Sequence, residues 1–318
     1  MKCIDAAATR AALPFDRLIA ALHAMFAAGC SVPARHVHQL GGADGPPGTV
    51  LIMPAWQERY LGIKTVNIFP ANAARGLPGL FSTYLLYDAA TGMPLAQIDG
   101  NEITTRRTAA ASALAARFLA RADARKLLIV GSGRVAAALA DAYRAVLPIE
   151  EVAVWSRNPA SAAALVAQLR EDGIPAQAWP DLEAATRQAD IVSCATLSTA
   201  PLIRGAWLAP GSHLDLIGGF TPQMIEADDD CFRSARIVVD TDEALQKAGD
   251  LLGPMARGVF GPSDIDATLA SLCRGQSPGR LDPSERTVFK SVGTALEDLA
   301  AAMLVMETVA PEPSADPS

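Results

Sequence analysis

The residues at positions 126–136 are Lys-Leu-Leu-Ile-Val-Gly-Ser-Gly-Arg-Val-Ala, and this stretch decides the fold. Four apolar residues, 127–130, run directly into a Gly-x-Gly-x-x-Ala pattern, and the alanine-rich residues 137–146 predict a helix. A buried strand, a tight glycine turn and a helix N-terminus are typical of a dinucleotide site, because free helix N–H groups bind the pyrophosphate. We therefore predict an α/β fold with a Rossmann-type doubly wound sheet. The candidate cofactor contacts in the turn are Gly131, Ser132, Gly133, Arg134 and Val135.

A second apolar run, residues 152–155, predicts the next strand, and it ends in Ser156, Arg157 and Asn158. In this fold the end of that strand contacts the adenosine ribose. An acidic residue there favours NAD, whereas a cation accommodates the 2′-phosphate of NADP. We predict that these three residues bind the cofactor, with NADP(H) favoured and NAD(H) also possible. The alternative is that Arg157 is an ordinary solvated loop cation.

The composition excludes several classes of partner. The chain has 318 residues, enough for roughly two domains, with 50% hydrophobic residues and a net charge of −7. This acidity argues against nucleic acid or an anionic membrane as a partner. The five cysteines are scattered without a C-x-x-C pair, and no long apolar window or signal peptide is evident, so we expect a cytoplasmic location. No metal site is expected, since His36 and His38 have no acidic or thiol neighbours.

The order of predicted elements divides the chain. An amphipathic helix over 14–28, a Gly/Pro turn over 41–48, strands over 49–53 and 62–68, and a hairpin of 81–87 with 95–98 indicate an α+β module. A helix over 104–121 follows, and strands and helices then alternate. The further predicted strands are 190–195, 213–217 and 236–240, and the clearer helices are 160–170, 182–187 and 241–248.

Residues 284–309 read as one long C-terminal helix, and the proline-rich end, 311–318, is expected to fray. We expect that helix to pack back on the first module. The predicted domains are therefore 1–114 together with 286–318, for substrate binding and dimerisation, and 115–285, for the dinucleotide. The active site is expected in the cleft between them, at the carboxyl ends of the parallel strands.

Four segments carry a resemblance to a known family. They are the residues 100–110, which include Arg107-Thr108-Ala109-Ala110, the glycine turn, the residues 195–201, and the residues 287–298, which include Val288-Phe289-Lys290-Ser291. With these segments the chain resembles the ornithine cyclodeaminase/mu-crystallin family across almost its whole length. The resemblance implies a nicotinamide cofactor and a homodimer. It also implies cofactor contacts at Thr83, Thr196, Leu197 and Ser291, and a substrate contact at Val292.

Two cations are the candidate catalytic residues. Arg107 lies at the start of a predicted helix, where a guanidinium can hold a substrate carboxylate at two points. Lys64 is a lone cation in an apolar strand, which is costly unless it faces solvent, a partner or a ligand. The resemblance implies that both bind substrate, with Lys64 orienting the carboxylate or donating a proton. It also implies a substrate contact at Arg35. The alternatives are a helix-start surface cation and an edge-strand lysine.

Phe220 is the main departure from the cyclodeaminases that the chain resembles. Those enzymes carry an aspartate at the matching position, and it handles the substrate amine. Phenylalanine can neither accept a proton nor pair with an ammonium group. Asp215 and Glu226 lie nearby in sequence but do not match that position. Phe220 instead predicts an apolar wall for a compact cyclic substrate, or else a plain core aromatic.

These observations predict an oxidoreductase that reduces a cyclic imino acid with NAD(P)H. Δ1-pyrroline-2-carboxylate, giving proline, is the favoured substrate, and Δ1-piperideine-2-carboxylate is close behind. Two alternatives remain open. One is a lyase of the same family, either an ornithine cyclodeaminase or a hydroxyproline dehydratase. The other is a non-catalytic protein that binds NADPH or another small ligand.

Overall fold

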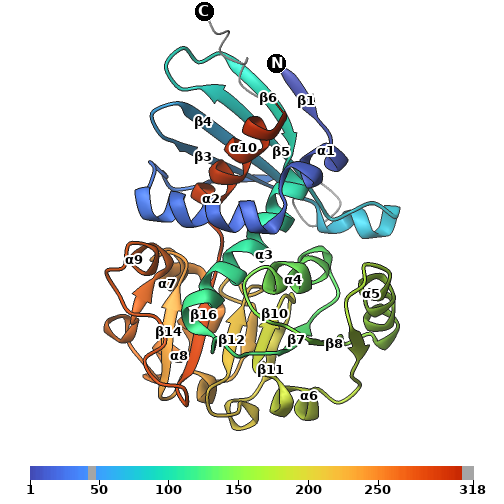
Figure 1. Cartoon of the computed structure of the whole chain (residues 1–318). Helices are drawn as coiled ribbons and strands as arrows, with labels where there is room; N and C mark the ends of the chain where they lie inside the picture. The colour runs from blue at the N-terminus through green and yellow to red at the C-terminus, as the bar shows by residue number, and fades with distance from the viewer. Residues whose placement is uncertain (42–47, 310–318) are drawn as a thin grey trace, which may run out of the picture. The chain divides into compact units, whose positions relative to one another are not determined.

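The computed structural model describes residues 1–41 and 48–309. The chain forms two compact units (Figure 1). The first comprises Met1–Arg107 and Thr294–Ser318, and the second comprises Thr108–Gly293. Helix α3, Gly100–Leu119, carries the chain from the first unit into the second.

The first unit is built on a six-stranded sheet in the order β1-β6-β5-β4-β3-β2. Its neighbouring strands are antiparallel, except that β1 pairs with β6 in parallel. The predicted strands and the hairpin of this module are confirmed. The strands are β1 (Lys2–Ile4), β2 (His36–Leu40), β3 (Gly48–Trp56), β4 (Tyr60–Ile68), β5 (Leu80–Asp88) and β6 (Pro94–Asp99).

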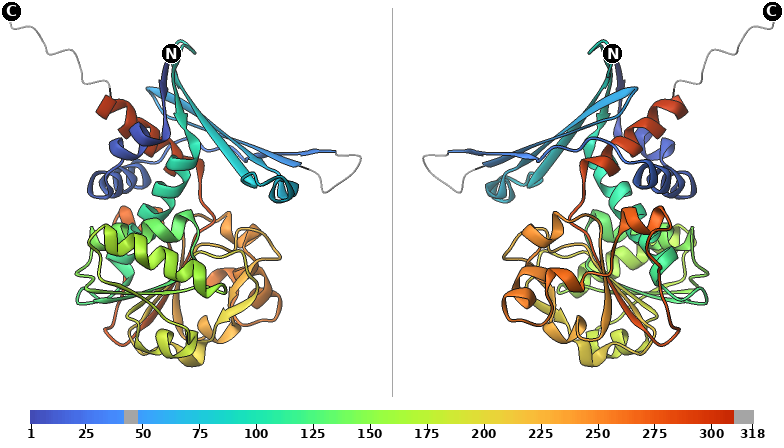
Figure 2. Two further views of the ribbon diagram at one scale, coloured as in Figure 1. Left: turned by 90° about the vertical axis from the view of Figure 1, so that its right-hand side faces the viewer. Right: turned by 90° about the vertical axis from the view of Figure 1, so that its left-hand side faces the viewer.

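Helices cover one face of this sheet (Figure 2). They are α1 (Ala6–Ala12), α2 (Phe15–Ala28) and α10 (Ala295–Val309); a short 3-10 turn, η1, spans Pro70–Arg75. The predicted apolar stripe of α2 is buried, including Leu18, Leu22 and Phe26. As expected, α10 packs back on this unit, against α2, β3 and β4. Burial of these side chains therefore fixes which face of β4 is covered.

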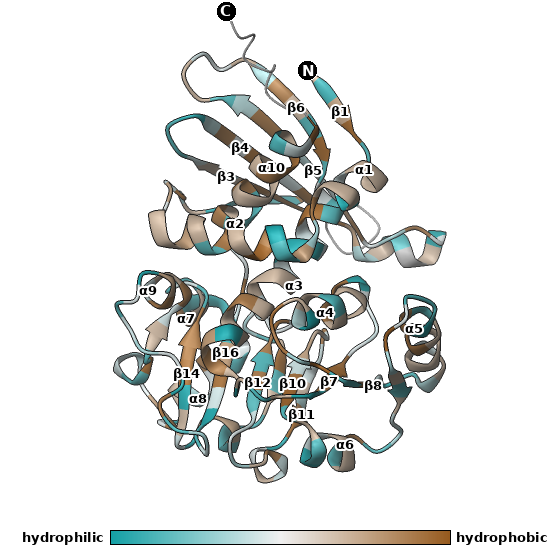
Figure 3. Ribbon diagram, viewed as in Figure 1, coloured by the Kyte–Doolittle hydropathy of each residue, from teal (hydrophilic) through white to brown (hydrophobic). Residues whose placement is uncertain are grey.

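The second unit is built on an eight-stranded parallel sheet in the order β15-β14-β16-β12-β10-β7-β8-β9. Strands β7 and β14 are hydrophobic along most of their length, as their brown colour shows (Figure 3). The strand order reverses beside β7, which is the position where doubly wound sheets bind ligands. The strands are β7 (Lys126–Val130), β8 (Glu151–Trp155), β9 (Ala176–Ala178), β10 (Ile191–Cys194), β12 (His213–Leu216), β14 (Ala235–Val239), β15 (Ala267–Thr268) and β16 (Arg286–Lys290).

Helices and a small second sheet complete this unit. The helices are α4 (Arg134–Arg144), α5 (Pro159–Glu171), α6 (Leu182–Gln188), α7 (Ala244–Lys247), α8 (Gly249–Ala256) and α9 (Leu269–Cys273), with 3-10 turns η2 (Gly205–Trp207), η3 (Asp229–Cys231) and η4 (Pro262–Asp264). Strands β11 (Thr199–Ile203) and β13 (Ile225–Ala227) pair in parallel. The predicted helix over 241–248 is thus α7, and α8 follows directly.

The prediction of one helix over 284–309 is wrong. Residues 286–290 form β16, which lies between β12 and β14, and the helix begins only at Ala295. Val288 and Phe289 are fully buried, and β-branched and aromatic side chains suit a strand with neighbours on both sides. Gly293, at φ +75°, ends the extended segment before the helix. The strand therefore belongs to the dinucleotide sheet, and the division between the compact units falls after it.

No single described helix is long and apolar enough to cross a membrane. Helices α1 and α2 are long and apolar enough only when they are counted together, and the chain bends between them. Most of the predicted turn over 41–48, namely 42–47, and the predicted frayed end, 311–318, lie outside the described residues.

Candidate functional site

The glycine turn after β7 has the geometry that a dinucleotide requires. Gly131 has φ +123°, and a Cβ there would lie 2.6 Å from the Ala195 carbonyl oxygen. Gly133 is the N-cap of α4, and no side chain caps that helix. A Cβ at Gly133 would meet no described atom within 4 Å. The turn therefore presents an open helix N-terminus, and a phosphate can approach its backbone closely.

The loop after β8 carries the three residues predicted to read the ribose. The Ser156 hydroxyl lies 3.1 Å from that of Ser132, which joins this loop to the glycine turn. Asn158 caps α5, because its side chain accepts a hydrogen bond from the Ala160 amide at 3.0 Å. Arg157 is exposed and forms no ion pair with a described residue. Of the three, Arg157 is thus the residue whose side chain has no structural role.

The other predicted cofactor residues of this unit follow neighbouring strands of the same parallel sheet. Thr196 and Leu197 come after β10, and Leu197 is 70% exposed. Ser291 and Val292 come after β16; Ser291 is buried and Val292 packs partly against the core. Because all these strands are parallel, their carboxyl ends meet at one edge. The loops that follow β7, β8, β10 and β16 therefore gather at that edge.

Phe220 lies in the loop after β12, and 38% of its surface is exposed. Its amide donates to the Gly218 carbonyl at 3.0 Å, which closes a tight turn. This exposure rules out the alternative of a plain core aromatic. An apolar ring is thus available at the edge where the cofactor loops gather.

The two predicted catalytic cations meet in the first unit around one carboxylate. Lys64 Nζ lies 2.7 Å from Asp298 Oδ2, and Arg107 Nε lies 3.0 Å from Asp298 Oδ1. Arg107 Nη1 also contacts Glu297 Oε2 at 2.5 Å. Lys64 Nζ further donates to the Thr104 hydroxyl at 3.4 Å. Strand β4, helix α3 and helix α10 therefore each contribute charged groups to one cluster, which we call the Lys64–Arg107 cluster.

This cluster is almost completely dry. Lys64 is 2% exposed, and both carboxylates are fully buried. Burial lowers the pKa of Lys64 to about 8; Asp298 opposes this shift, and Arg107 adds to it. Burial also raises the pKa of Tyr84, the cross-strand neighbour of Lys64, well above its ordinary value, and Asp298 adds to that shift. An ammonium group with such a pKa holds its proton at neutral pH but can release it readily.

The other two predicted residues of the first unit lie apart from each other. Strand β2 pairs with β3, and β3 with β4, so extending the register by one residue sets Arg35 opposite Met53 and in line with Lys64. At the usual strand spacing, Arg35 is then about 10 Å from Lys64 along the same face. Thr83 pairs with Thr65 and therefore lies on the opposite face of the sheet from Lys64.

Sequence reasoning did not single out Glu297 or Asp298 as site residues. A signal was present, because two adjacent acidic residues interrupt the run Ala-Leu-Glu-Asp-Leu-Ala-Ala-Ala-Met-Leu at the start of α10. Carboxylates in an otherwise apolar helix indicate buried, paired charges. They also lie in the first turn of α10, where the helix dipole favours negative charge.

Comparison with known proteins identifies the family and the fold. The model of the ornithine cyclodeaminase/mu-crystallin family matches residues 18–312. A Δ1-pyrroline-2-carboxylate reductase of Paracoccus denitrificans is 45% identical over 84% of this chain and 85% of its own length. The Thermococcus litoralis enzyme of that name, solved with NADH and L-proline, is 31% identical; it has a TM-score of 0.91 and covers 97% of each chain. An archaeal alanine dehydrogenase dimer with bound NAD has a TM-score of 0.89 at 30% identity and covers 97% of this chain and 96% of that one.

Proposed function

The chain belongs to the ornithine cyclodeaminase/mu-crystallin family, and we propose that it reduces a cyclic imino acid with NAD(P)H. The substrate we favour is Δ1-pyrroline-2-carboxylate, and the product is L-proline; Δ1-piperideine-2-carboxylate is the second candidate. The observation that carries this proposal is the Lys64–Arg107 cluster. The names of the Paracoccus and Thermococcus relatives support it.

The charge of the cluster favours a substrate that carries both signs. Lys64 and Arg107 supply two positive charges, and Glu297 and Asp298 supply two negative charges. A lone anion would leave a net charge in a dry site, which is costly. A ring with a carboxylate beside a protonated imine adds no net charge. In this proposal Arg107 holds the carboxylate and Arg35 supports it from the same sheet face, while the acidic pair faces the imine nitrogen.

Lys64 is the proposed proton source. Hydride addition to the carbon of the protonated imine leaves a neutral ring amine, and Lys64 would supply the proton that turns this amine into the ammonium group of L-proline. With a pKa of about 8, Lys64 is mainly protonated at neutral pH. Asp298, 2.7 Å away, fixes the ammonium group and stabilises its charge until the proton leaves.

Phe220 supports a reductase over a lyase. A cyclodeaminase must bind a second substrate amine and manage its protons, and a phenyl ring has no group for this. The exposed ring of Phe220 instead suits the apolar carbons of a small cyclic substrate. Val292, half-buried after β16, is the second apolar side chain that we propose at the substrate.

The residues at the carboxyl edge of the parallel sheet fit a nicotinamide dinucleotide. The open N-terminus of α4 and the bare Cα of Gly133 suit the pyrophosphate. When bound, the reduced nicotinamide supplies the hydride. Arg157 would contact a 2′-phosphate, so we propose that NADPH is preferred over NADH. Ser132, Ser156, Thr196, Leu197 and Ser291 complete the proposed contacts, and Thr83 adds one from the first unit.

We also propose a cytoplasmic homodimer. The sheet face opposite the helices carries Trp56, Leu61, Ile63 and Leu85, which are in register across β3, β4 and β5; Trp56 is exposed and the other three are partly exposed. A second copy would cover this apolar face, and the archaeal alanine dehydrogenase is described as a dimer. The five cysteines are all free, which suits a reducing compartment. Light scattering of the purified protein measures the mass directly.

A substrate panel tests the function. Purified protein should oxidise NADPH rapidly with Δ1-pyrroline-2-carboxylate, and it should release no ammonia from L-ornithine. Arg107→Ala should cost about 2–5 kcal/mol of transition-state stabilisation, because the substrate carboxylate loses its partner. Arg106→Ala is the matched control, since Arg106 donates to the Leu13 carbonyl and lies over the Phe15 ring, and it should keep activity. Proline formation from ornithine, or full activity in Arg107→Ala, would overturn the proposal.

A further inference from the structure

Behind the loops at the carboxyl edge of the parallel sheet lies a second set of buried charges. Glu226 on β13, Asp250 on α8 and Lys290 on β16 are all fully buried, and Asp240, directly after β14, is 1% exposed. None of them matches the position where the family's cyclodeaminases carry an aspartate. Each buried carboxylate is costly to desolvate, so the bonds that it makes must account for its presence.

Glu226 joins the loops that follow the paired strands β10 and β12. Its Oε1 accepts hydrogen bonds from the amide and the hydroxyl of Thr196, both at 2.7 Å. Its Oε2 accepts from the Gly218 amide, also at 2.7 Å. One carboxylate therefore ties the loop after β10, which carries Thr196 and Leu197, to the loop after β12, which carries Phe220.

The packing at this junction leaves no room for adjustment. A Cβ on Gly218 would lie 1.7 Å from the Thr196 carbonyl oxygen and 2.6 Å from Glu226 Oε1. Asp250 holds Glu226 in turn, since its Oδ1 accepts from the Glu226 amide at 2.7 Å and its Oδ2 pairs with Lys290 Nζ at 3.0 Å. The spacing of the two loops is thus held by close backbone packing together with the Glu226 carboxylate.

We propose that Glu226 is a positioning residue, whose ionised carboxylate holds the loops after β10 and β12 in the arrangement that binds the nicotinamide cofactor. The proposal rests on the proposed function for the identity of the ligand. The ionised carboxylate accepts all three bonds as charge-assisted hydrogen bonds. A protonated carboxyl could turn its O–H only towards the Thr196 hydroxyl, so the Thr196 and Gly218 amides would then donate to a neutral group and the bridge would weaken.

This bridge makes cofactor binding depend on pH near neutrality. Burial raises the pKa of Glu226 to about 7; Lys290 lowers it, and Asp250 raises it further. The charged and titratable groups that face Glu226 in the described chain are Asp250 on α8, Lys290 on β16 and the Cys194 thiol on β10. Only the ionised fraction would bind tightly, so affinity should fall as the pH drops through 7.

The chain offers a matched control in Asp215. This carboxylate, on β12 of the same unit, is also fully buried, and burial raises its pKa to about 6. Its partners are the side chains of Ser112, Tyr143 and Ser193, at 3.1, 2.8 and 2.5 Å, and none of them lies in a loop at the carboxyl edge. Asp215→Asn therefore removes a similar buried charge without touching the bridge.

The experiment measures NADH binding alone, by fluorescence, from pH 6 to pH 8. NADH is chosen because it lacks the 2′-phosphate, which itself titrates near pH 6. The wild-type Kd should rise about five- to tenfold from pH 8 to pH 6. Glu226→Gln should bind about five- to tenfold more weakly at pH 8 and show almost no pH dependence. Asp215→Asn should keep the wild-type slope.

A wild-type slope in Glu226→Gln, or its loss in Asp215→Asn, would overturn the proposal. If Glu226→Gln does not fold, the proposal is tested instead by hydrogen exchange of the Thr196 and Gly218 amides in the wild-type protein. These two protection factors should fall together between pH 8 and pH 6, and constant values would refute the bridge. Because exchange requires no ligand, a protein that binds no NADH would contradict the proposed function and leave this result standing.

Discussion

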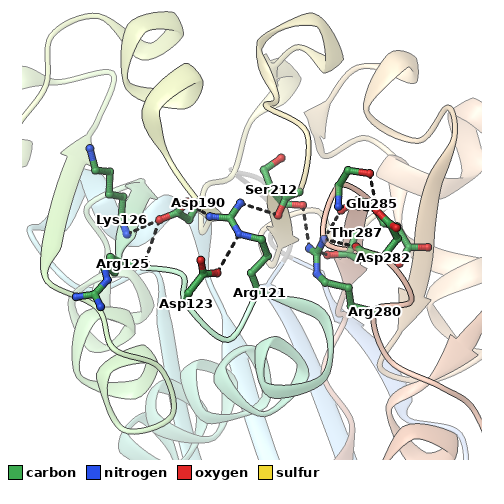
Figure 4. A network of polar contacts seen from close by, with 12 residues as sticks. Arg121, Asp123, Arg125, Lys126, Asp190, Ser212, Arg280, Asp282, Glu285 and Thr287 are labelled. Carbon is green, nitrogen blue, oxygen red and sulfur yellow. Dashed lines mark hydrogen bonds and ion pairs between the residues drawn. The ribbon is translucent and has the colours of Figure 1, made fainter.

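The two ends of the parallel sheet in the second unit carry polar networks of different kinds. At the amino ends, Asp190 accepts from the amides of Arg125 and Lys126 at 2.9 and 3.0 Å and pairs with Arg121 at 2.5 Å (Figure 4). Asp190 and Arg121 are both partly exposed. At the carboxyl ends, Glu226, Asp250 and Lys290 are sealed from water.

The amino-end network continues through Arg280. Its guanidinium donates to the carbonyls of Leu119, Ser212 and Glu285 and to the Thr287 hydroxyl, which in turn donates to Leu119 (Figure 4). All these partners lie at or before the first residues of strands or at the end of α3. These hydrogen bonds therefore fix the first residues of the strands. Because the charged groups stay partly exposed to water, burying them costs little free energy.

The difference between the ends indicates different roles. Amino-end bonds stabilise the sheet at little cost, whereas buried ion pairs add little net stability compared with apolar packing. The carboxyl-end charges hold the loops that follow β10, β12 and β16, through the amides of Thr196, Gly218 and Val292. We infer that the amino end maintains the fold and the carboxyl end maintains the shape of the site.

Lys290→Met should produce the largest effect on stability. It leaves Asp250 as a buried carboxylate without its cation, so the free energy of unfolding should fall by about 3–5 kcal/mol. Urea denaturation followed by circular dichroism measures this. Adding Asp250→Asn removes the unpaired charge and should recover part of the loss. A loss below about 1 kcal/mol in the single variant would show that the pair is better solvated than its burial indicates.

Asp190→Ala should have a smaller effect, confined to the amino end. It removes three hydrogen bonds at a partly exposed site, so we expect a loss of about 1–3 kcal/mol in unfolding free energy. Reductase activity per folded molecule should remain at the wild-type level. Lost activity without lost stability would break the division between the two ends.

The contributions of Asp190 and Glu226 to the free energy of unfolding should change with pH in opposite directions. Burial raises the pKa of Asp190, but the amides of Arg125 and Lys126 and the Arg121 guanidinium outweigh this and lower it. Its stabilisation is therefore present at neutral pH and is lost only in acid. Glu226 has a raised pKa, so the folded state binds the extra proton, and its contribution to stability falls as the pH rises towards 7.

The sequence predicted those parts of the fold that depend on local patterns. Strands β7, β8 and β14 each contain three or more consecutive apolar residues, and the glycine turn after β7 has its own signature. Strand β16 was missed because its five residues are a strand only through pairing with β12 and β14, whose residues are far away in the chain. Such pairing cannot be read from a short mixed segment like Arg-Thr-Val-Phe-Lys.

The same limit applies to the charges. Lys64 was singled out because a cation in an apolar strand is conspicuous. Glu226 and Asp250 were not, because acidic residues near turns and helix starts are usually solvated, and only tertiary packing shows that these two are buried. Asp298 became recognisable as a partner of Lys64 only when α10 was seen to pack on β4.

Arg157→Ala should have the smallest effect on stability and sharpens the comparison further. Arg157 lies at the carboxyl edge, like Glu226, but it is exposed and pairs with no described residue, so unfolding free energy should change by less than about 0.5 kcal/mol. If it contacts a 2′-phosphate, the KM for NADPH should rise about tenfold, because a charge-assisted bond contributes about 1.5 kcal/mol or more. The KM for NADH should hardly change, and the ratio of the two constants is the measurement.

Asn158→Ala is the control. Loss of the α5 cap should cost about 1 kcal/mol of stability, and the KM values for NADPH and NADH should change alike. Equal losses for NADPH and NADH in Arg157→Ala would mean that this edge holds the dinucleotide without reading its phosphate, and the preference for NADPH would then be wrong.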